Sequence, residues 1–385
     1  MTHRLRTLIF GIAALPGWGQ QTSTPAVRSP EIAPDRTVTF RLSAPKATEA
    51  TLTGEFMKGS KSLEKDSHGV WSVTIGPLDP EIYNYNFTID GVRTIDPLNP
   101  NVKTGSTPST IASILEVKGE RPAFYDGQAV PHGEIRTNWY QSKSLGALRR
   151  VTVYTPPDYD QSTQAYPVLY LLHGANADET AWTRLGHVNL ILDNLMAARK
   201  AKQFVVVMPF GYGVPPGTRG SENEALFSRD LIEDVIPFVQ SKYRVSPDRM
   251  QRAIVGLSMG GGQALGIGLN HLELFASVGG FSSGLRPAEF EKTFAGVAAN
   301  PKGANEKLRL LWIGCGKDDG AMAGSKSLSE FLTKHQIKHT FRESEGAHTW
   351  MVWRRYLNEV APLLFREAAL ASLPGAGLAQ HPFLY

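Results

Sequence analysis

The sequence RAIVGLSMGGG, residues 252–262, combines a short apolar run, a glycine-flanked serine and a small-residue segment. The apolar run 253–255 predicts a buried strand, and the small residues after it predict the opening of a helix. Between them, Gly-x-Ser-x-Gly is the pattern of a nucleophile elbow, in which a serine hydroxyl stands on a sharp strand-to-helix turn. Side chains at Gly256 and Gly260 would collide with neighbouring backbone there. The stretch therefore makes Ser258 the candidate nucleophile.

A second Gly-x-Ser-x-Gly pattern occurs at residues 280–284, also after a strand-like apolar run. It continues into Leu285-Arg286-Pro287, and a proline at this place favours the start of a new helix over an elbow. The motif by itself is weak evidence, because a glycine-rich chain of this length can contain it by chance. The strand and helix around Ser258 favour it over Ser282.

Short apolar strands alternate with amphipathic segments through the second part of the chain. The expected strands are 151–154, 166–172, 204–208, 253–255, 276–278, 308–313 and 340–343. The expected helices are 185–199, 226–243, 261–269, 328–335 and 350–365. This alternation predicts a mostly parallel sheet covered on both faces. With an elbow in its middle, residues 134–370 are predicted to form an α/β-hydrolase domain.

A serine nucleophile needs a base, and the base needs an anion that orients it and stabilises the imidazolium. In α/β-hydrolases the acid and then the histidine follow the serine, on loops after later strands. The strand 308–313 runs into Gly-Cys-Gly-Lys-Asp-Asp, which places Asp319 at a strand end. One strand later, His348 lies on a glycine-containing loop before a helix. The predicted catalytic residues are therefore Ser258, Asp319 and His348.

The strand 166–172 ends in His173-Gly174-Ala175-Asn176, where an α/β-hydrolase makes the first half of its oxyanion hole. Backbone N–H groups of Gly174 and Ala175, together with that of Met259, are expected to hold the tetrahedral oxyanion. His173 itself is expected to be a structural or pocket-lining residue.

The N-terminal part follows a different pattern. Residues 33–118 alternate apolar and polar side chains with turn signals between short runs, which predicts a small all-β, immunoglobulin-like sandwich. Its Trp71, Tyr83 and Tyr85 are expected to fill the core, because aromatics at strand spacing usually pack. The Pro- and Gly-containing residues 119–133 are predicted to be a linker.

The first residues resemble an export signal. Arg4 and Arg6 precede a short apolar stretch, so residues 1–20 are predicted to be a signal peptide and the protein to be secreted or periplasmic. No apolar stretch reaches the length of a membrane span. The 40 basic and 36 acidic residues are interleaved without a basic stripe, which argues against nucleic acid. A single cysteine excludes an intrachain disulfide framework. No cofactor or metal motif is found.

Residues 142–365 resemble the esterase D-type Putative esterase family, which includes carbohydrate esterase family 1. Segments that carry the resemblance are Tyr170-Leu171-Leu172-His173-Gly174, Asp178-Glu179-Thr180-Ala181-Trp182, Phe227-Ser228-Arg229-Asp230-Leu231, Gly256-Leu257-Ser258-Met259-Gly260-Gly261, Leu274-Phe275, Gly316-Lys317-Asp318-Asp319 and Gly346-Ala347-His348-Thr349-Trp350 with Trp353-Arg354. The family's catalytic residues fall on Ser258, Asp319 and His348. Many members have Gly-x-Asn-Asp where this chain has Gly-Lys-Asp-Asp, so the second acid aligns and Asp318 is disfavoured.

The N-terminal part is similar to early-set domains related to family 48 carbohydrate-binding modules. Segments that carry this resemblance are Phe40 with Ala44-Pro45, Thr53-Gly54-Glu55-Phe56, Gly69-Val70-Trp71, Tyr83-Asn84-Tyr85, Asp90-Gly91 and Asp96-Pro97. Some members of that family bind glucans or xylan. The sequence does not decide whether this sandwich binds glycan or shapes the active site.

The resemblance implies a secreted feruloyl esterase that releases hydroxycinnamates from arabinoxylan, with an esterified polysaccharide or oligosaccharide as its partner. Candidates for a wall against the aromatic acyl group are Trp182, Phe210, Tyr212, Trp350 and Trp353. Of these, Trp182, Trp350 and Tyr212 are the predicted substrate-binding residues, and Trp353, on the helix after the base, is expected to pack in the core. Alternatives on the same residues are an acetyl xylan esterase, an enterobactin-type siderophore esterase and an acyltransferase. A glycan-binding protein with an inactive hydrolase domain is the non-enzymatic alternative. The acyl group, the sugar and the oligomeric state stay open.

Overall fold

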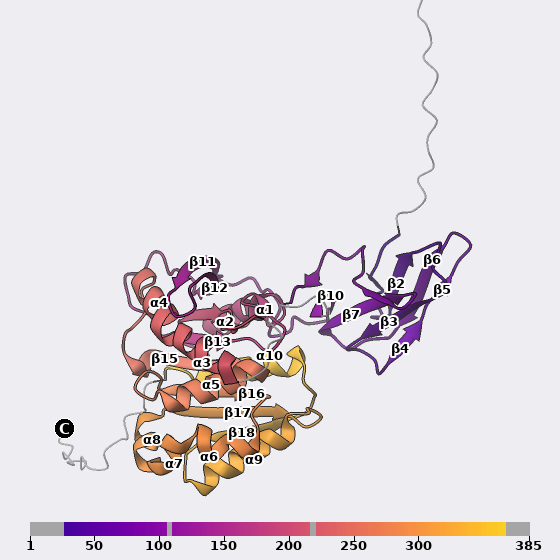
Figure 1. The fold of residues 1–385 in the computed structure, drawn as a ribbon. Coiled ribbons are helices and arrows are strands. Elements are labelled where there is room, and N and C mark those ends of the chain that lie inside the picture. The colour runs from indigo at the N-terminus through magenta and orange to yellow at the C-terminus, as the bar shows by residue number, and fades with distance from the viewer. Residues whose placement is uncertain (1–26, 106–109, 216–220, 367–385) are drawn as a thin grey trace, which may run out of the picture.

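The computed structural model describes residues 27–105, 110–215 and 221–366. It has an all-antiparallel β-sandwich followed by a mixed sheet with helices on both faces (Figure 1). The predicted fold class, an α/β-hydrolase preceded by a small β-sandwich, is confirmed. Within the described ranges no helix is long and apolar enough to cross a membrane. The predicted signal peptide, residues 1–20, lies outside the described residues, as do residues 367–370 of the predicted hydrolase domain.

Two antiparallel sheets form the sandwich, with strand orders β1-β2-β6-β5 and β4-β3-β7-β10-β9, and β8 pairs with β7. The strands are β1 (Glu31–Ile32), β2 (Val38–Ser43), β3 (Ala50–Gly54), β4 (Ser60–Ser62), β5 (Glu64–Lys65), β6 (Val70–Ile75), β7 (Glu81–Ile89), β8 (Val92–Thr94), β9 (Val102–Lys103) and β10 (Ala112–Val117). Trp71, Tyr83 and Tyr85 are buried in the core between the sheets. They pack the sandwich, so none of the three presents a stacking face to a glycan.

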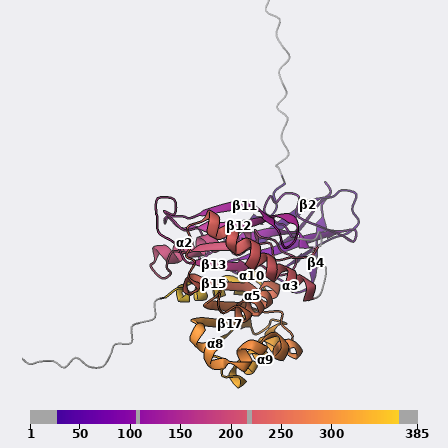
Figure 2. The ribbon, with the colours of Figure 1, turned by 60° about the vertical axis from the view of Figure 1, so that its left-hand side comes forward.

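The α/β domain is built on one eight-stranded sheet in the order β11-β12-β14-β13-β15-β16-β17-β18. The strands are β11 (Glu134–Ser142), β12 (Ala147–Thr155), β13 (Val168–Leu172), β14 (Val205–Pro209), β15 (Arg252–Leu257), β16 (Ser277–Phe281), β17 (Leu310–Gly316) and β18 (Thr340–Ser344). The six strands β13 to β18 run parallel, and β11 and β12 form an antiparallel hairpin at the edge. Figure 2 shows β11, β12, β13, β15 and β17 following one another across this domain.

Helices cover both faces of this sheet. One face packs against α3 (Ser221–Arg229), α4 (Ile236–Lys242), α5 (Ser258–Asn270), α6 (Phe290–Thr293), α7 (Ala295–Ala299), α8 (Pro301–Lys307) and α9 (Met322–Lys334). The other packs against α1 (Ala181–Arg184), α2 (Val188–Ala197) and α10 (Trp350–Val360). The sequence predicted a single helix over 226–243, whereas a wider, π-type segment at Asp230–Val235 joins α3 to α4.

The sandwich docks on the α/β domain through α10. Arg354 of this helix is fully buried, forms an ion pair with Glu81 of β7, and donates a hydrogen bond to the Leu185 carbonyl at 2.5 Å. Ile82 packs into the apolar core of the α/β domain, and Met351 packs against the sandwich core. Removing one partner of a buried ion pair leaves an uncompensated charge, which typically costs about 3–5 kcal/mol. The two domains are therefore held in one arrangement close to the loop that carries His348.

Candidate active site

The turn between β15 and α5 has the geometry of a nucleophile elbow. Ser258 adopts φ = +53°, a left-handed backbone conformation that residues other than glycine rarely adopt. A Cβ atom at Gly256 would lie 2.2 Å from the Gly260 carbonyl oxygen, and one at Gly260 would lie 2.4 Å from the His173 carbonyl oxygen. Both glycines are required by close backbone approach, which lets the turn present the Ser258 hydroxyl at the end of the strand.

Three side chains from separate loops meet beside this turn. The Ser258 Oγ lies 2.9 Å from the His348 Nε2, and the His348 Nδ1 lies 2.9 Å and 3.0 Å from the two carboxylate oxygens of Asp319. His348 lies between β18 and α10, and Asp319 follows β17. With the proton on Nδ1, the ring donates to Asp319 and its Nε2 can accept the hydroxyl proton of Ser258. This is the arrangement that activates a serine for attack on a carbonyl carbon.

The carboxylate of Asp319 is buried yet favoured in its ionised form. Burial alone would raise the pKa of Asp319, but hydrogen bonds from His348, Ser282 and the backbone N–H of Ala321 together hold it below its ordinary value of 3.8. The Ala321 bond is 2.8 Å long. Asp318, the adjacent acid, is exposed. Asp319 is therefore a carboxylate at neutral pH and can stabilise a protonated His348.

Ser282, the serine of the second Gly-x-Ser-x-Gly pattern, lies on the buried side of the site. Ser282 is fully buried, its hydroxyl accepts a 3.0 Å hydrogen bond from the Trp353 Nε1, and it hydrogen-bonds to Asp319. Trp353 also packs edge-on against the His348 ring, with ring centroids 4.9 Å apart. Ser282 therefore contacts the acid of the site and the pocket residue Trp353 without lining the pocket itself, a role that the motif alone did not predict.

The strand end expected to supply oxyanion donors lies next to Ser258. Gly174 and Ala175 line the same pocket as Ser258, and a Cβ atom at Gly174 would lie 3.3 Å from the Ser258 Cβ. Met259 is the second residue of α5, so its backbone N–H belongs to the free N-terminal turn of the helix. Such N–H groups favour developing negative charge.

His173 fixes the loop that carries these groups. Its Nδ1 donates to the Gly174 carbonyl oxygen at 2.8 Å, and its Nε2 accepts from the Gly211 N–H at 2.9 Å. Burial lowers the pKa of His173 to about 4, so the ring is neutral in this arrangement. Both ring nitrogens are engaged by backbone, so His173 is structural and is not a second base.

Of the three aromatic residues expected to line the pocket, only Trp350 does so. Trp182 is 1% exposed, donates to the Leu172 carbonyl at 3.0 Å and packs edge-on behind Trp350. Tyr212 is buried, and its hydroxyl accepts the Asn176 N–H at 2.7 Å. The prediction was wrong for Trp182 and Tyr212, because backbone groups engage their polar atoms inside the protein. Trp353 lines the pocket in their place.

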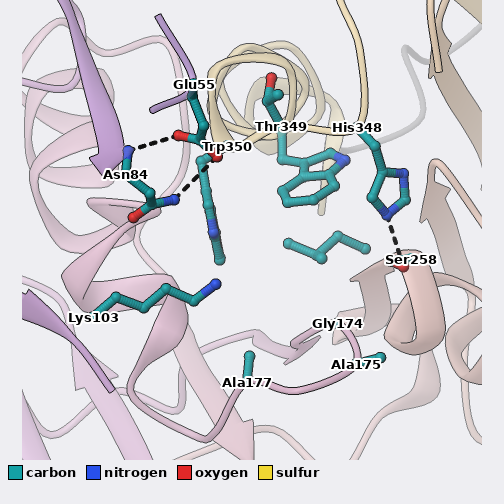
Figure 3. A pocket seen from close by; sticks show the side chains of 12 residues that line it. Glu55, Asn84, Lys103, Gly174, Ala175, Ala177, Ser258, His348, Thr349 and Trp350 are labelled. Atoms are coloured by element: carbon teal, nitrogen blue, oxygen red, sulfur yellow. Dashed lines mark hydrogen bonds between the residues drawn. The ribbon is translucent and has the colours of Figure 1, made fainter. Parts of the chain in front are cut away.

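Three pocket residues come from the sandwich. Glu55, Asn84 and Lys103 line the cavity of about 200 Å³ that also contains Ser258 and His348. Figure 3 shows them across the pocket from Ser258, with the Lys103 side chain extending into the space between. The segments around Glu55 and Asn84 were visible in the sequence only as a fold pattern, and nothing marked Lys103. Because the domain contact places them here, the sandwich takes part in shaping the pocket.

A Ser-His-Asp arrangement at an elbow of an α/β-hydrolase sheet defines the class of serine hydrolases. Within that class, residues 142–364 match the Esterase family, described as Putative esterase, and the chain belongs to this family. Its α/β domain is a carboxylic-ester hydrolase that is similar to feruloyl esterases.

Individual relatives agree with this placement. The chain is 34% identical to an endo-1,4-beta-xylanase/feruloyl esterase of Xylanibacter ruminicola over 85% of its own length, but it covers only 44% of that relative. A CE1 ferulic acid esterase of Anaeromyces mucronatus, solved with ferulic acid, is 25% identical, with a TM-score of 0.55 over 65% of this chain and 98% of that one.

The enterobactin esterase of Shigella flexneri has the same overall fold, with a TM-score of 0.64 over 85% of this chain and 92% of that one. Its sequence identity is 19%, so this likeness concerns the fold alone. The chain spans about half the length of the first two curated relatives that it matches, 44% and 54%.

Proposed function

We propose that this protein is a serine esterase that releases ferulate and related hydroxycinnamates from esterified xylan. The observation that carries the proposal is the Ser258 hydroxyl, hydrogen-bonded to His348 at 2.9 Å and opening on a pocket walled by Trp350 and Trp353. Indole rings suit a flat aromatic acyl group. The similarity to a xylanase/feruloyl esterase and to a ferulic acid esterase supports the same substrate class.

In the proposed reaction the Ser258 oxygen attacks the ester carbonyl carbon while its proton passes to the His348 Nε2. Backbone N–H groups of Gly174, Ala175 and Met259 stabilise the resulting oxyanion. The bond to the sugar oxygen then breaks, and this oxygen leaves with the proton from Nε2. Water, deprotonated by His348, attacks the acyl carbon, so the free acid departs and Ser258 regains its proton. Asp319 stays ionised and supports the imidazolium throughout.

The test is a substrate panel assayed with the full chain: methyl ferulate, feruloylated arabinoxylan, acetylated xylan and enterobactin. We expect the highest kcat/KM on the feruloyl esters, with free ferulate as the product, and no release by Ser258→Ala. Turnover of acetylated xylan or enterobactin without ferulate release would overturn the proposed substrate class. Transfer of the feruloyl group to a sugar hydroxyl in place of hydrolysis would identify an acyltransferase.

We also propose that the chain acts outside the cytoplasm, where polymeric xylan is found. The basis is the basic start and apolar core within residues 1–20. Fractionation of expressing cells tests this. Retention of the full-length chain in the cytoplasm would contradict it.

A further inference from the structure

The pocket beside Ser258 has two chemically different walls. One wall is apolar and aromatic, with Leu257, Trp350 and Trp353. Trp350 and Trp353 pack edge-on with centroids 5.4 Å apart, and each is 6% exposed, so neighbouring rings hold them in place. The opposite wall, from the sandwich, is polar and charged. A ligand that fills both parts therefore has an apolar body and a polar tip.

The size of the pocket limits what it can enclose. Its volume of about 200 Å³ lies below the roughly 300–1,000 Å³ of pockets that bury drug-sized ligands. A single ring with a short side chain suits this space, whereas a stretch of polysaccharide does not. The acyl group of the substrate is therefore the part to be enclosed, and the sugar chain lies outside.

Lys103 is the charged group of the polar wall that has no direct partner among the residues that the structure describes. Its ammonium makes no hydrogen bond or ion pair with any residue that the structure describes, although its side chain is half-buried. The nearby Glu55 is occupied elsewhere, because its carboxylate accepts hydrogen bonds from the backbone N–H of Asn84 at 2.8 Å and from the side-chain amide of Asn84 at 3.1 Å.

The surroundings of Lys103 make this lack of a contact partner unfavourable. Burial lowers the pKa of Lys103, the negative charge of Glu55 raises it, and the positive charge of Arg93 lowers it, with a net shift below 10.5. A partly desolvated cation gains from a ligand oxygen that accepts its hydrogen bond. Figure 3 shows the side chain directed from β9 into the pocket, opposite Ser258, so a ligand acylating Ser258 would meet it at its far end.

We propose that Lys103 of the sandwich binds the phenolic oxygen of the hydroxycinnamoyl group and thereby sets the acyl specificity of the site. The ring lies against the tryptophan wall, the ester carbonyl faces Ser258, and the para hydroxyl oxygen accepts a hydrogen bond from the Lys103 ammonium. A cinnamoyl group carries its para position at the end opposite the carbonyl, which matches the opposed placement of the two residues. This inference rests on the proposed function.

The experiment compares methyl p-coumarate, which has the para hydroxyl, with methyl cinnamate, which lacks it. For the wild type we expect kcat/KM to favour the p-coumarate at least tenfold, the size of effect that a hydrogen bond to a charged group gives. Lys103→Met keeps the apolar stem and removes the ammonium, and it should bring this ratio close to one. Lys103→Arg keeps a cationic donor and should retain most of the preference.

A matched control is Lys118→Met, in the same domain. Lys118 is exposed and does not line the pocket, so its removal should leave the ratio at the wild-type value. Thermal unfolding of all variants shows whether the sandwich still folds and docks. A correctly folded Lys103→Met with an unchanged ratio would overturn the inference.

Two further outcomes separate the possible failures. If Lys103→Met changes only the turnover of uronate-bearing feruloylated oligosaccharides, the ammonium binds a carboxylate of the sugar chain and the phenolic assignment is wrong. If the wild type hydrolyses neither methyl ester nor any feruloylated substrate, the proposed function fails, and the inference fails with it.

Discussion

The turns at residues 256–260 and 280–284 have the same Gly-x-Ser-x-Gly pattern, and both serines adopt a positive φ, +53° at Ser258 and +48° at Ser282. Each follows a parallel strand of the same sheet, β15 and its neighbour β16. Their surroundings differ. The Ser258 hydroxyl faces a pocket and the His348 ring, whereas the Ser282 hydroxyl is buried between Trp353 and Asp319.

The comparison shows that local backbone geometry does not make a serine a nucleophile. A nucleophile also needs a base at hydrogen-bond distance and room for the substrate, and both come from distant segments of the chain. In this protein the turn at residues 280–284 supports the acid, because Ser282 hydrogen-bonds to Asp319 on the buried side of the site. The following changes test this division of roles.

The largest effect is expected from Ser258→Ala. Loss of the hydroxyl should lower kcat for ester hydrolysis by about 10⁴-fold or more while the fold is kept. Labelling by a fluorophosphonate probe, read by intact-protein mass spectrometry, should disappear in this variant and persist in Ser282→Ala. Labelling of Ser282 in place of Ser258 would reverse the assignment.

Asp319→Asn should lower kcat by roughly 10⁴-fold, because an amide cannot stabilise the imidazolium and favours the wrong tautomer of His348. Asp318→Asn is the matched control, since that side chain is exposed and outside the hydrogen-bond chain. Equal losses in the two variants, measured on a soluble ester, would contradict the assignment of Asp319.

The last glycines of the two turns should respond differently to a methyl group. At Gly260 it would meet backbone at 2.4 Å, so Gly260→Ala should lower the free energy of unfolding by about 3 kcal/mol. At Gly284 the nearest atom lies at 3.9 Å, so Gly284→Ala should change it by less than about 0.5 kcal/mol. Urea denaturation measures both, and equal values would show that the turns are packed alike.

The smallest effect is expected from Ser282→Ala, a loss of about tenfold in kcat with little change in KM, because Ser282 acts through Asp319.

The lowered pKa of Asp319 means that folding favours its carboxylate, so this contribution to stability is present above pH 3.8 and is lost as the pH falls below it. Without the Ser282 hydrogen bond the contribution shrinks. The difference in unfolding free energy between wild type and Ser282→Ala should therefore narrow on acidification. Ser282→Thr should restore part of the stability that Ser282→Ala loses. A difference in unfolding free energy that does not change with pH would argue that Ser282 has a packing role only.

The chemistry-bearing segments of the α/β domain were visible in the sequence because each is local. An apolar run, a glycine-flanked serine and an acid at a strand end need only a few consecutive residues. The helix predicted directly after Ser258, against the proline that follows Ser282, distinguished the two serines. β11 was missed, since its polar, largely exposed residues carry no apolar pattern and its place in the sheet comes from pairing with β12. Trp182 and Tyr212 were assigned to the pocket because residue type alone does not show which way a ring faces.

The sequence by itself determined the two kinds of sheet, the elbow, and the order of serine, acid and histidine, because hydrophobic period and turn chemistry are set by neighbouring residues. Only the tertiary structure decided that Lys103 and Glu55 enter the pocket, that Ser282 supports Asp319, and that Arg354 ties the domains together. These contacts join residues far apart in the chain, and they depend on how the sandwich docks on helix α10 of the α/β domain. No local sequence pattern determines this docking.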